Sequence, residues 1–474
     1  MHIHILGICG TFMAGVAALA KACGHTVTGC DAQVYPPMSE QLRALGIELI
    51  EGYDPAQTAL APDCYVIGNV VSRARLADGT PRYPLMEAIL DQGLPYTSGP
   101  QWLAEHILPG RHVLAVAGTH GKTSTSSMLA WILQANGLEP GFLIGGIAQN
   151  FGISARPGRA APPGQRSCFV IEADEYDTAF FDKRSKFLHY RPRTLVLGNL
   201  EFDHADIFDD LAAIERQFHH LIRTVPGQGR ILCNAEDANL ARVLQQGLWS
   251  ELRGFGQPGA LAPAALARHG LSAQGSDQHF SVCRDGQALG QVQWALSGRH
   301  NQLNALAAIA AAEHVGVPVA DAAHALARFE SVRRRMELRG SARGVQVYDD
   351  FAHHPTAIAT TLDGLRRSLP ASQRVLAVFE PRSNTMKLGA MAAQLPAALQ
   401  VADLVFAYNP QLGWDVAAAL APLGPKAQVH EQLPSLVQAI AGAAQPGDHI
   451  VCMSNGSFGG IHELLLQALR STGG

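Results

Sequence analysis

The segment Ala115–Ser124 constrains the fold more than any other part of the chain. Its sequence, AVAGTHGKTS, runs from an apolar strand into a turn with glycines at 118 and 121, and a helical pattern begins at Lys122. Glycine adopts backbone angles that other residues avoid, so the amide N–H groups of such a turn can face a bound phosphate. The positive end of the following helix strengthens that attraction. The segment therefore predicts a phosphate-binding loop between a buried strand and a helix.

Lys122 and Thr123 occupy the two positions that give a phosphate loop its chemistry. The lysine would neutralise charge on the β- and γ-phosphates of a nucleoside triphosphate, and the threonine hydroxyl would bind Mg²⁺. The match departs from the usual motif, because Val116 stands where its first glycine belongs. A chance turn is the alternative interpretation. The predicted nucleotide contacts of this loop are Gly118, Thr119, His120, Gly121, Lys122, Thr123 and Ser124.

Two further apolar strands end in polar side chains. The segment 169–177 (FVIEADEYD) ends in four carboxylates, and the segment 195–204 (LVLGNLEFDH) ends in Asn, Glu, Asp and His. The carboxyl ends of parallel strands face the ligand crevice of an open α/β sheet, and carboxylate oxygens suit Mg²⁺. We therefore predict a magnesium site beside the phosphate loop. His204 is either a contact of that site or a core or capping histidine.

Strands alternate with helices along most of the chain, which predicts parallel α/β sheets covered on both faces. The length of 474 residues predicts about three domains. The expected boundaries give domains at residues 1–109, 110–331 and 332–474. Two segments inside the second domain depart from this strand–helix alternation. Residues 156–166 are rich in Pro, Gly and Arg and predict a surface loop, and residues 257–290 predict a small antiparallel patch.

Composition and charge exclude several classes of protein. Lys plus Arg is 36 and Asp plus Glu is 40, so the net charge is 36 − 40 = −4, which argues against a nucleic acid or an anionic membrane as partner. The chain has neither a signal-peptide pattern at its start nor an apolar run of about 18 residues. Its eight cysteines are scattered without a CxxC pair, as is typical of a reducing cytoplasm. We expect a cytoplasmic protein and make no prediction of its oligomeric state.

Six segments, in chain order, together resemble the Mur ligases: GTHGKTS at 118–124, EADEYD at 172–177, NLEFDH at 199–204, GRHNQLNALAA at 298–308, RRRME at 333–337 and DDFAHHP at 349–355. That family makes amide bonds with ATP. The resemblance implies a three-domain Mur ligase architecture. A Rossmann-like N-terminal domain would bind a UDP-sugar, a P-loop central domain would bind ATP and Mg²⁺, and a Rossmann-like C-terminal domain would bind the incoming peptide.

The resemblance also implies roles for particular residues. By position, the catalytic group would comprise Lys122, Glu172, His204, Arg335 and Asp350, with Thr123, Glu172 and His204 as the metal ligands. His300, Asn301, Asn304 and Arg335 would lie near the adenine and phosphates of ATP. For the side-chain amides of Asn301 and Asn304, the alternative to a ligand is hydrogen bonding to neighbouring backbone. For the arginines of the segment 333–335, the alternative is a solvated basic stretch. Several family members carry a carbamylated lysine, but the expected helix 212–224 has no lysine, so we predict no carbamyl group.

Four further segments are similar to one member of the family: 34–39, 180–187, 379–387 and 453–462. That member joins the lactyl carboxylate of UDP-N-acetylmuramate to the amine of the murein tripeptide L-Ala-γ-D-Glu-meso-diaminopimelate in peptidoglycan recycling. The implied peptide contacts are Arg382, Ser383, Asn384 and Lys387. The alternatives are a UDP-N-acetylmuramate–L-alanine ligase, an NAD-linked oxidoreductase and a nucleotide-sugar sensor without catalysis.

The first glycine turn bears on the oxidoreductase alternative. Cys9 and Phe12 stand where a dinucleotide-binding GxGxxG motif has its second and third glycines, which disfavours NAD. A strand, glycine turn and helix can still bind a pyrophosphate, and UDP carries one. The predicted contacts of the UDP-sugar are Gly7, Gly10, Thr11 and Asp31, with a loop-exposed aspartate as the alternative for the last.

Overall fold

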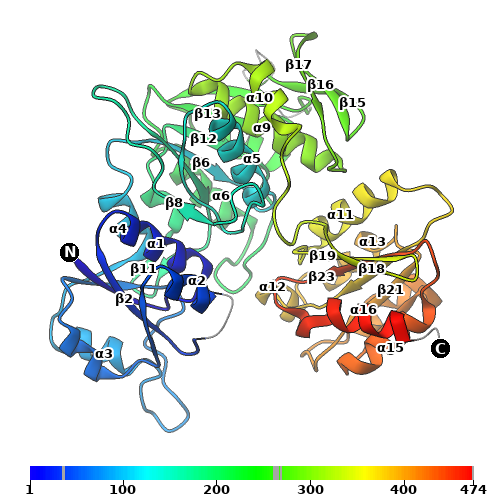
Figure 1. Ribbon diagram of the computed structural model, residues 1–474, viewed down its shortest axis with the longest axis horizontal. Coiled ribbons are helices and arrows are strands. Elements are labelled where there is room, and N and C mark those ends of the chain that lie inside the picture. The colour runs from blue at the N-terminus through cyan, green and yellow to red at the C-terminus, as the bar shows by residue number, and fades with distance from the viewer. Residues whose placement is uncertain (35–37, 260–265, 267–269, 472–474) are drawn as a thin grey trace.

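Three large β-sheets, each with its own helices, and two small antiparallel sheets make up the described part of the protein (Figure 1). The computed structural model describes residues 1–34, 38–259, 266 and 270–471. The sequence segment 34–39 therefore lies partly outside the described residues. The N-terminal sheet, the central sheet and the C-terminal sheet occupy three lobes, coloured blue, cyan to green, and yellow to red in Figure 1.

The N-terminal sheet has five parallel strands in the order β3-β2-β1-β4-β5. The apolar run at the start of the chain becomes β1, with Ile3 and Ile5 fully buried, as expected of a strand covered on both faces. The strands are β1 (His2–Leu6), β2 (Thr26–Asp31), β3 (Glu48–Glu51), β4 (Cys64–Ile67) and β5 (Tyr96–Ser98), and the helices are α1 (Thr11–Ala22), α2 (Met38–Ala44), α3 (Pro84–Asp91) and α4 (Gly99–His106).

The central sheet has seven strands in the order β14-β13-β12-β6-β9-β7-β8, all parallel except β8. The strands are β6 (His112–Ala117), β7 (Gly141–Leu143), β8 (Ala155–Arg156), β9 (Cys168–Ala173), β12 (Thr194–Leu197), β13 (Arg230–Asn234) and β14 (Glu251–Phe255). The helices are α5 (Lys122–Ala135), α6 (Leu211–Ile222), α7 (Ala238–Gln245), α9 (Arg299–His314) and α10 (Val319–Leu326). Helix α9 is rich in alanine and packs closely against α5, and both belong to one apolar cluster.

Two small antiparallel units are attached to the central sheet. One is the hairpin of β10 (Asp177–Ala179) and β11 (Asp182–Ser185). The other is the three-stranded sheet of β15 (Ser272–Gly275), β16 (His279–Arg284) and β17 (Gln287–Gln293), which confirms the antiparallel patch expected from the sequence.

The C-terminal sheet has six strands in the order β18-β19-β23-β20-β21-β22, and β18 alone of these runs antiparallel to its neighbour. The strands are β18 (Glu337–Ala342), β19 (Val345–Asp350), β20 (Val375–Phe379), β21 (Leu404–Tyr408), β22 (Ala427–His430) and β23 (His449–Met453). The helices are α11 (Pro355–Ser368), α12 (Asn384–Lys387), α13 (Leu395–Ala398), α14 (Val416–Leu420), α15 (Leu433–Ala443) and α16 (Ile461–Ser471).

The two junctions between the sheets differ in chemistry. Helix α1 packs against β7 and β8, and the apolar cluster of the N-terminal lobe continues into the central lobe through Leu143 and Phe187. The contact is close: a Cβ on Gly15 would lie 2.2 Å from Leu143 Cδ1. The C-terminal lobe meets the central lobe through polar pairs, such as Thr385 Oγ1 donating to Asp203 Oδ1 at 2.7 Å, and through Phe202, which packs against the apolar cluster of the C-terminal lobe.

Among the described residues, no helix is long and apolar enough to cross a membrane. All eight cysteines are free. The three sheets occupy residues 2–98, 112–255 and 337–453. The domain boundaries at 109 and 331 lie between them and stay a proposal.

The core under the central sheet offers a test of stability. Phe218 on α6 is fully buried, and its ring meets that of Phe187 edge-on at 5.4 Å. We expect Phe218→Ala to lower the free energy of unfolding by about 3–5 kcal/mol, since it removes a buried ring and leaves a cavity. Phe181→Ala, at a side chain 39% exposed, is the control and should change stability far less. Urea denaturation of both variants measures the difference, and equal losses would contradict this description of the core.

Candidate active site

The loop between β6 and α5 has the backbone geometry of an anion-binding turn. Gly118 has a φ of 147° and Gly121 a φ of 76°, and both values lie in the region that favours glycine. Gly121 also precedes the first turn of α5, where no side chain caps the helix, so the first N–H groups are left for a ligand. A Cβ on Gly121 would approach Asn304 Oδ1 to 2.7 Å. A larger residue at 121 would therefore crowd the junction of α5 and α9.

The segment after β12 holds this loop in shape. Asn199 accepts from the His120 N–H at 2.8 Å through Oδ1 and donates to the His120 carbonyl at 3.0 Å through Nδ2. Thr119 Oγ1 accepts from the N–H of Glu201 at 2.9 Å. The strands β6 and β12 are neighbours in the sheet, so their carboxyl ends bring these two segments together. Ser124 lies in the first turn of α5.

Lys122 is a buried cation held by two carboxylates. Its Nζ lies 2.6 Å from Glu175 Oε2 and 3.8 Å from Asp174 Oδ1, and its side chain is only 11% exposed. Burial disfavours the charge, but the two carboxylates more than offset it and raise the pKa of Lys122. The amine is therefore charged and held at the mouth of the phosphate loop.

Thr123 and Glu172 form a pair that fits the predicted magnesium site. Thr123 Oγ1 donates to Glu172 Oε1 at 3.0 Å, and the Gly145 N–H donates to Glu172 Oε2 at 2.7 Å. Burial raises the pKa of Glu172, and the charge of Lys122 with the hydrogen bonds from Gly145 and Thr123 opposes that rise only in part. A divalent cation at this carboxylate would stabilise its charged form.

His204 lies with a second group of carboxylates. Its Nε2 is 3.3 Å from Glu175 Oε1, and one ligand atom from each of Asp174, Glu175 and His204 lies within 4.8 Å of the others. Glu175 is 1% exposed, and apart from this contact with His204 its Oε1 has no polar partner among the described residues. A buried carboxylate oxygen next to further carboxylate oxygens and an imidazole fits a hard cation such as Mg²⁺.

The backbone of His204 adopts a conformation that is rare for a residue other than glycine. His204 has a φ of 56°, in the left-handed region, and its N–H donates to Asp203 Oδ1 at 2.7 Å. Such a conformation persists where the surroundings hold it. Glu175 and Asp174 were not among the metal ligands expected from the sequence. The available signal was the group of four carboxylates at and just after the end of β9, which does not tell which side chains turn inward.

The residues expected near adenine divide into two groups. Asn304 lies against Gly121 of the phosphate loop, and its contact with ATP stays a prediction. Asn301 Nδ2 donates to the Ser297 carbonyl at 2.8 Å, so this amide has the backbone partner that was its alternative. Burial and, after it, the charge of Arg335 lower the pKa of His300 to about 4, so His300 is neutral near pH 7.

Arg335 and Asp350 lie at the start of the C-terminal lobe, and the charge of Arg335 contributes, after burial, to the lowered pKa of His300 in the central lobe. The guanidinium of Arg335 lies 5.2 Å from the ring centre of Phe351. Asp350 is buried and accepts from the N–H groups of Met336 and Ala352, each at 2.8 Å. It therefore holds two loops of its own lobe together. Arg334 donates to the carbonyls of Ser454 and Gly456, and a contact of its neighbour Arg335 with a nucleotide stays a prediction.

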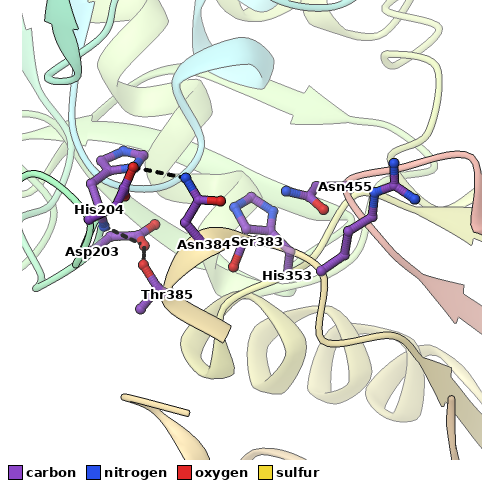
Figure 2. Close-up of a pocket in the computed structure, with 9 residues that line it drawn as sticks. Asp203, His204, His353, Ser383, Asn384, Thr385 and Asn455 are labelled. Carbon is purple, nitrogen blue, oxygen red and sulfur yellow. Dashed lines mark hydrogen bonds between the residues drawn. The ribbon is translucent and has the colours of Figure 1, made fainter. Parts of the chain in front are cut away.

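A cavity of about 220 Å³ opens between the central and C-terminal lobes (Figure 2). From the central lobe it is lined by Asp203, His204 and Asp206. From the C-terminal lobe it is lined by His353, Arg382, Ser383, Asn384, Thr385 and Asn455. Three of the four expected peptide contacts are thus in the lining, next to the candidate metal end. Lys387 is exposed and is not part of that lining.

The residues expected to bind the UDP-sugar meet at the first glycine turn. Gly7 has a φ of 78°, and Gly10 precedes the first turn of α1, which Thr11 begins without a side-chain cap. Asp31 Oδ2 accepts from the Cys9 N–H at 2.8 Å, so this aspartate holds the turn. A ligand contact of Asp31 stays a prediction.

Comparison with known protein families matches most of the chain, in three segments. The Mur ligase family catalytic domain matches residues 2–110, the Mur ligase middle domain residues 116–312, and the Mur ligase glutamate ligase domain residues 334–456. The three matches follow the three sheets in order.

Individual relatives cover the same length. The UDP-N-acetylmuramate–L-alanyl-γ-D-glutamyl-meso-2,6-diaminoheptandioate ligase of Escherichia coli is 53% identical over 99% of this chain and 98% of its own. The UDP-N-acetylmuramate–L-alanine ligase of Acidothermus cellulolyticus is 34% identical over 98% of this chain and 94% of its own. Among solved structures, a murein peptide ligase of Psychrobacter arcticus has a TM-score of 0.75 and 44% identity, with 99% of each chain covered.

Removing the charge of Lys122 tests the phosphate loop. We expect Lys122→Met to weaken binding of Mg²⁺ and a non-hydrolysable ATP analogue by at least about 100-fold, since a buried charged contact is lost. Lys21→Met, on α1 in the N-terminal lobe, is the matched control and should bind as the wild type does. Isothermal titration calorimetry measures both affinities. Unchanged binding by Lys122→Met would exclude the loop as the nucleotide site.

His204 gives the metal site a dependence on pH. Burial disfavours the imidazolium, but Glu175, Asp203 and Asp174 outweigh burial and raise the pKa of His204 above its usual 6.5. A metal ion binds the neutral ring, so protons compete with the ion below that raised pKa. We expect Mn²⁺ affinity to fall about tenfold per pH unit as the pH decreases through this region. His204→Gln should remove that slope, and a pH-independent affinity in the wild type would contradict the assignment.

Proposed function

Because the chain belongs to the Mur ligase family, we propose that it uses ATP to join the lactyl carboxylate of UDP-N-acetylmuramate to the amine of L-Ala-γ-D-Glu-meso-diaminopimelate. The observation that carries the proposal is the cavity between the lobes, where His204 of the central lobe faces Arg382, Ser383 and Asn384 of the C-terminal lobe. A phosphate-activated carboxylate and a peptide amine could meet there. The relative from Escherichia coli, 53% identical over its whole length, carries this activity in its name.

The reaction has two steps. The carboxylate first takes the γ-phosphoryl group of ATP, which gives an acyl phosphate and ADP. The α-amine of the peptide then attacks the acyl carbon, loses a proton and expels inorganic phosphate, which leaves the amide. Both steps need charge neutralisation and alignment rather than a nucleophilic side chain.

The residues of this chain supply that neutralisation and alignment. Lys122 would move from Glu175 toward the phosphates of bound ATP, while the N–H groups at the start of α5 would hold the β-phosphate. Thr123, Glu172 and the group around His204 would hold Mg²⁺, which when bound spreads the charge of the transferring phosphoryl group. Docking of the C-terminal lobe would exclude water from the acyl phosphate.

The three lobes divide the substrates. We assign the UDP-sugar to residues 1–109, ATP to 110–331 and the peptide to 332–474. Gly7, Gly10 and Thr11 would bind the pyrophosphate at the start of α1, because that helix end is uncapped by side chains. His300, Asn304 and Arg335 would surround the nucleotide where α9 meets the C-terminal lobe. Eight free cysteines fit a cytoplasmic location, which we retain as part of the proposal.

A UDP-N-acetylmuramate–L-alanine ligase is the second candidate, favoured by the relative from Acidothermus cellulolyticus at 34% identity. The two activities share the nucleotide sugar and differ in the amine. Measuring ADP release with UDP-N-acetylmuramate fixed and either free L-Ala or the tripeptide as amine separates them. We expect release to require both substrates and to prefer the tripeptide by at least about 100-fold in kcat/KM. A preference for free L-Ala would overturn the proposal.

Arg382 tests the peptide side of the cavity. We expect Arg382→Ala to raise the KM for the tripeptide about tenfold or more, since a guanidinium contact to a carboxylate is lost. The KM for ATP should stay unchanged. Lys387→Ala is the matched control, because Lys387 lies five residues away and outside the cavity lining. Equal effects of the two variants would remove Arg382 from the peptide site.

A further inference from the structure

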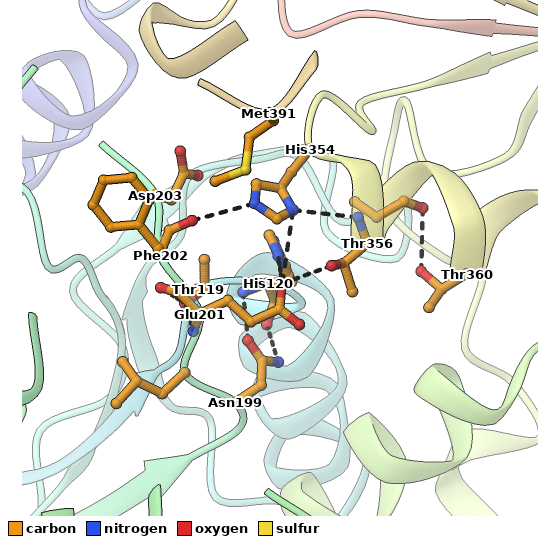
Figure 3. A network of polar contacts seen from close by, with 12 residues as sticks. Thr119, His120, Asn199, Glu201, Phe202, Asp203, His354, Thr356, Thr360 and Met391 are labelled. Atoms are coloured by element: carbon orange, nitrogen blue, oxygen red, sulfur yellow. Dashed lines mark hydrogen bonds and ion pairs between the residues drawn. The ribbon is translucent and has the colours of Figure 1, made fainter. Parts of the chain in front are cut away.

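One carboxylate joins the phosphate loop to the C-terminal lobe. Glu201 lies four residues after the end of β12, and its Oε2 accepts from Thr356 Oγ1 at 2.6 Å and lies 3.3 Å from His120 Nε2 (Figure 3). Thr356 belongs to the first turn of α11, and His120 belongs to the phosphate loop. A single side chain of the central lobe therefore contacts both the loop and the neighbouring lobe.

The surroundings hold Glu201 in its charged form. Burial would favour the neutral acid, but His120, Thr356 and the nearby His354 outweigh burial and lower the pKa of Glu201 to about 2. The carboxylate also lies at the amino end of α11, which carries partial positive charge. The contact thus joins a charged acceptor to a hydroxyl and to a helix end of the other lobe.

The backbone of Glu201 is fixed from the opposite side. The Glu201 N–H donates to Thr119 Oγ1 at 2.9 Å. The same hydroxyl donates in return to the Glu201 carbonyl oxygen at 3.2 Å. Whatever holds the side chain of Glu201 therefore also acts on residues 119 and 120 of the phosphate loop. The ring of His120 lies 4.6 Å from that of His354, so the imidazole of the loop is packed against the C-terminal lobe as well.

Hydrogen bonds within the protein account for the grouping of His120, Glu201 and His354 without a metal ion. The ligand atoms of His120, Glu201 and His354 lie within 4.8 Å of one another, as a transition metal would need. However, Thr356 Oγ1 already donates to Glu201, the Thr356 N–H donates to His354 Nδ1 at 3.3 Å, and His354 Nε2 lies 3.3 Å from the Phe202 carbonyl. The acceptors are thus satisfied within the protein, and the cluster is a hydrogen-bond network.

We propose that Glu201 is a positioning residue that transmits docking of the C-terminal lobe to the phosphate loop, through Thr356 on one side and His120 on the other. When α11 docks, Thr356 fixes the carboxylate, and the carboxylate fixes the ring of His120 two residues before Lys122. When α11 leaves, that hydrogen bond is lost and the loop keeps only its contacts within the central lobe. Phosphoryl transfer would then be favoured only when the peptide-binding lobe is in place.

Two threonines on α11 provide a matched test. Thr356 donates across the junction to Glu201, whereas Thr360, one turn later, donates at 3.1 Å to the Ala357 carbonyl of its own helix (Figure 3). Thr356→Val removes the hydroxyl with little change of shape, Thr356→Ser keeps it, and Thr360→Val is the control. The kinetic comparison of these variants rests on the proposed ligase activity. We expect Thr356→Val to lower kcat about tenfold, because a hydrogen bond to a charged group is lost, with the KM for UDP-N-acetylmuramate unchanged.

Thr356→Ser should recover most of the lost kcat, and Thr360→Val should behave as the wild type does. Equal kcat values for Thr356→Val and Thr360→Val would overturn the proposal, and so would a failure of serine to restore activity. Glu201→Ala combined with Thr356→Val should lower kcat no further than Glu201→Ala alone, because both changes interrupt one connection. Additive losses would contradict that connection.

A second measurement separates this inference from the proposed function. Small-angle X-ray scattering with ADP and Mg²⁺ reports how compact the chain is, whichever amine it uses. We expect a larger mean radius of gyration for Thr356→Val than for Thr360→Val under the same conditions. Equal radii would contradict the role of Glu201 in docking. Absence of amide formation by the wild type would instead overturn the proposed function, while the difference in radius would still support docking through Glu201.

Discussion

The parallel arrangement of β6, β9 and β12 in the centre of one sheet is the constraint on which the candidate site depends. These three strands are neighbours, so the glycine turn after the first, the carboxylates after the second and the Asn-His segment after the third all meet at one edge. None of the three segments makes a site alone. Where they meet, the buried amine of Lys122 lies between Glu175 and Asp174, and the ring of His204 contacts Glu175. The charges compensate one another in a place where a single buried charge would be costly.

The same edge also explains where the other lobes attach. A ligand crevice at the carboxyl ends of parallel strands is open to solvent until another unit covers it. The C-terminal lobe covers it with the start of α11 and with the loop 382–385. These contacts are hydrogen bonds to carboxylates, and beside them Phe202 of the central lobe packs against the apolar core of the C-terminal lobe. Polar contacts of this kind can form and break as a substrate enters between the lobes.

The sequence predicted the local elements well, because their signals are local. The phosphate loop, the limits of α5 and the antiparallel patch follow from glycine placement and from the period of apolar residues. The roles of Glu175 and Glu201 could not be read in this way. Each depends on a partner more than fifty residues away in the chain, Lys122 for the first and Thr356 for the second. Four adjacent carboxylates give no period that tells which of them turns inward.

Arg334 and Arg335 show the same limit. They are adjacent basic residues in the chain, and the structure separates them by giving Arg334 two carbonyls of the loop 454–456 and leaving Arg335 over the ring of Phe351. Asp350, expected at the nucleotide, is bound to backbone N–H groups of its own lobe. Its effect on a nucleotide would pass through the shape of the loops that carry Arg335.

The packing of Gly15 against Leu143 has a consequence for how the chain can be divided. Since α1 and β7 share one apolar cluster, the first two sheets form a single unit of folding stability. A fragment that begins after residue 109 would expose that cluster to water and would tend to aggregate. The last sheet has apolar clusters of its own and meets the central lobe through polar side chains and Phe202, so a fragment carrying it alone is the piece of this chain best suited to independent expression.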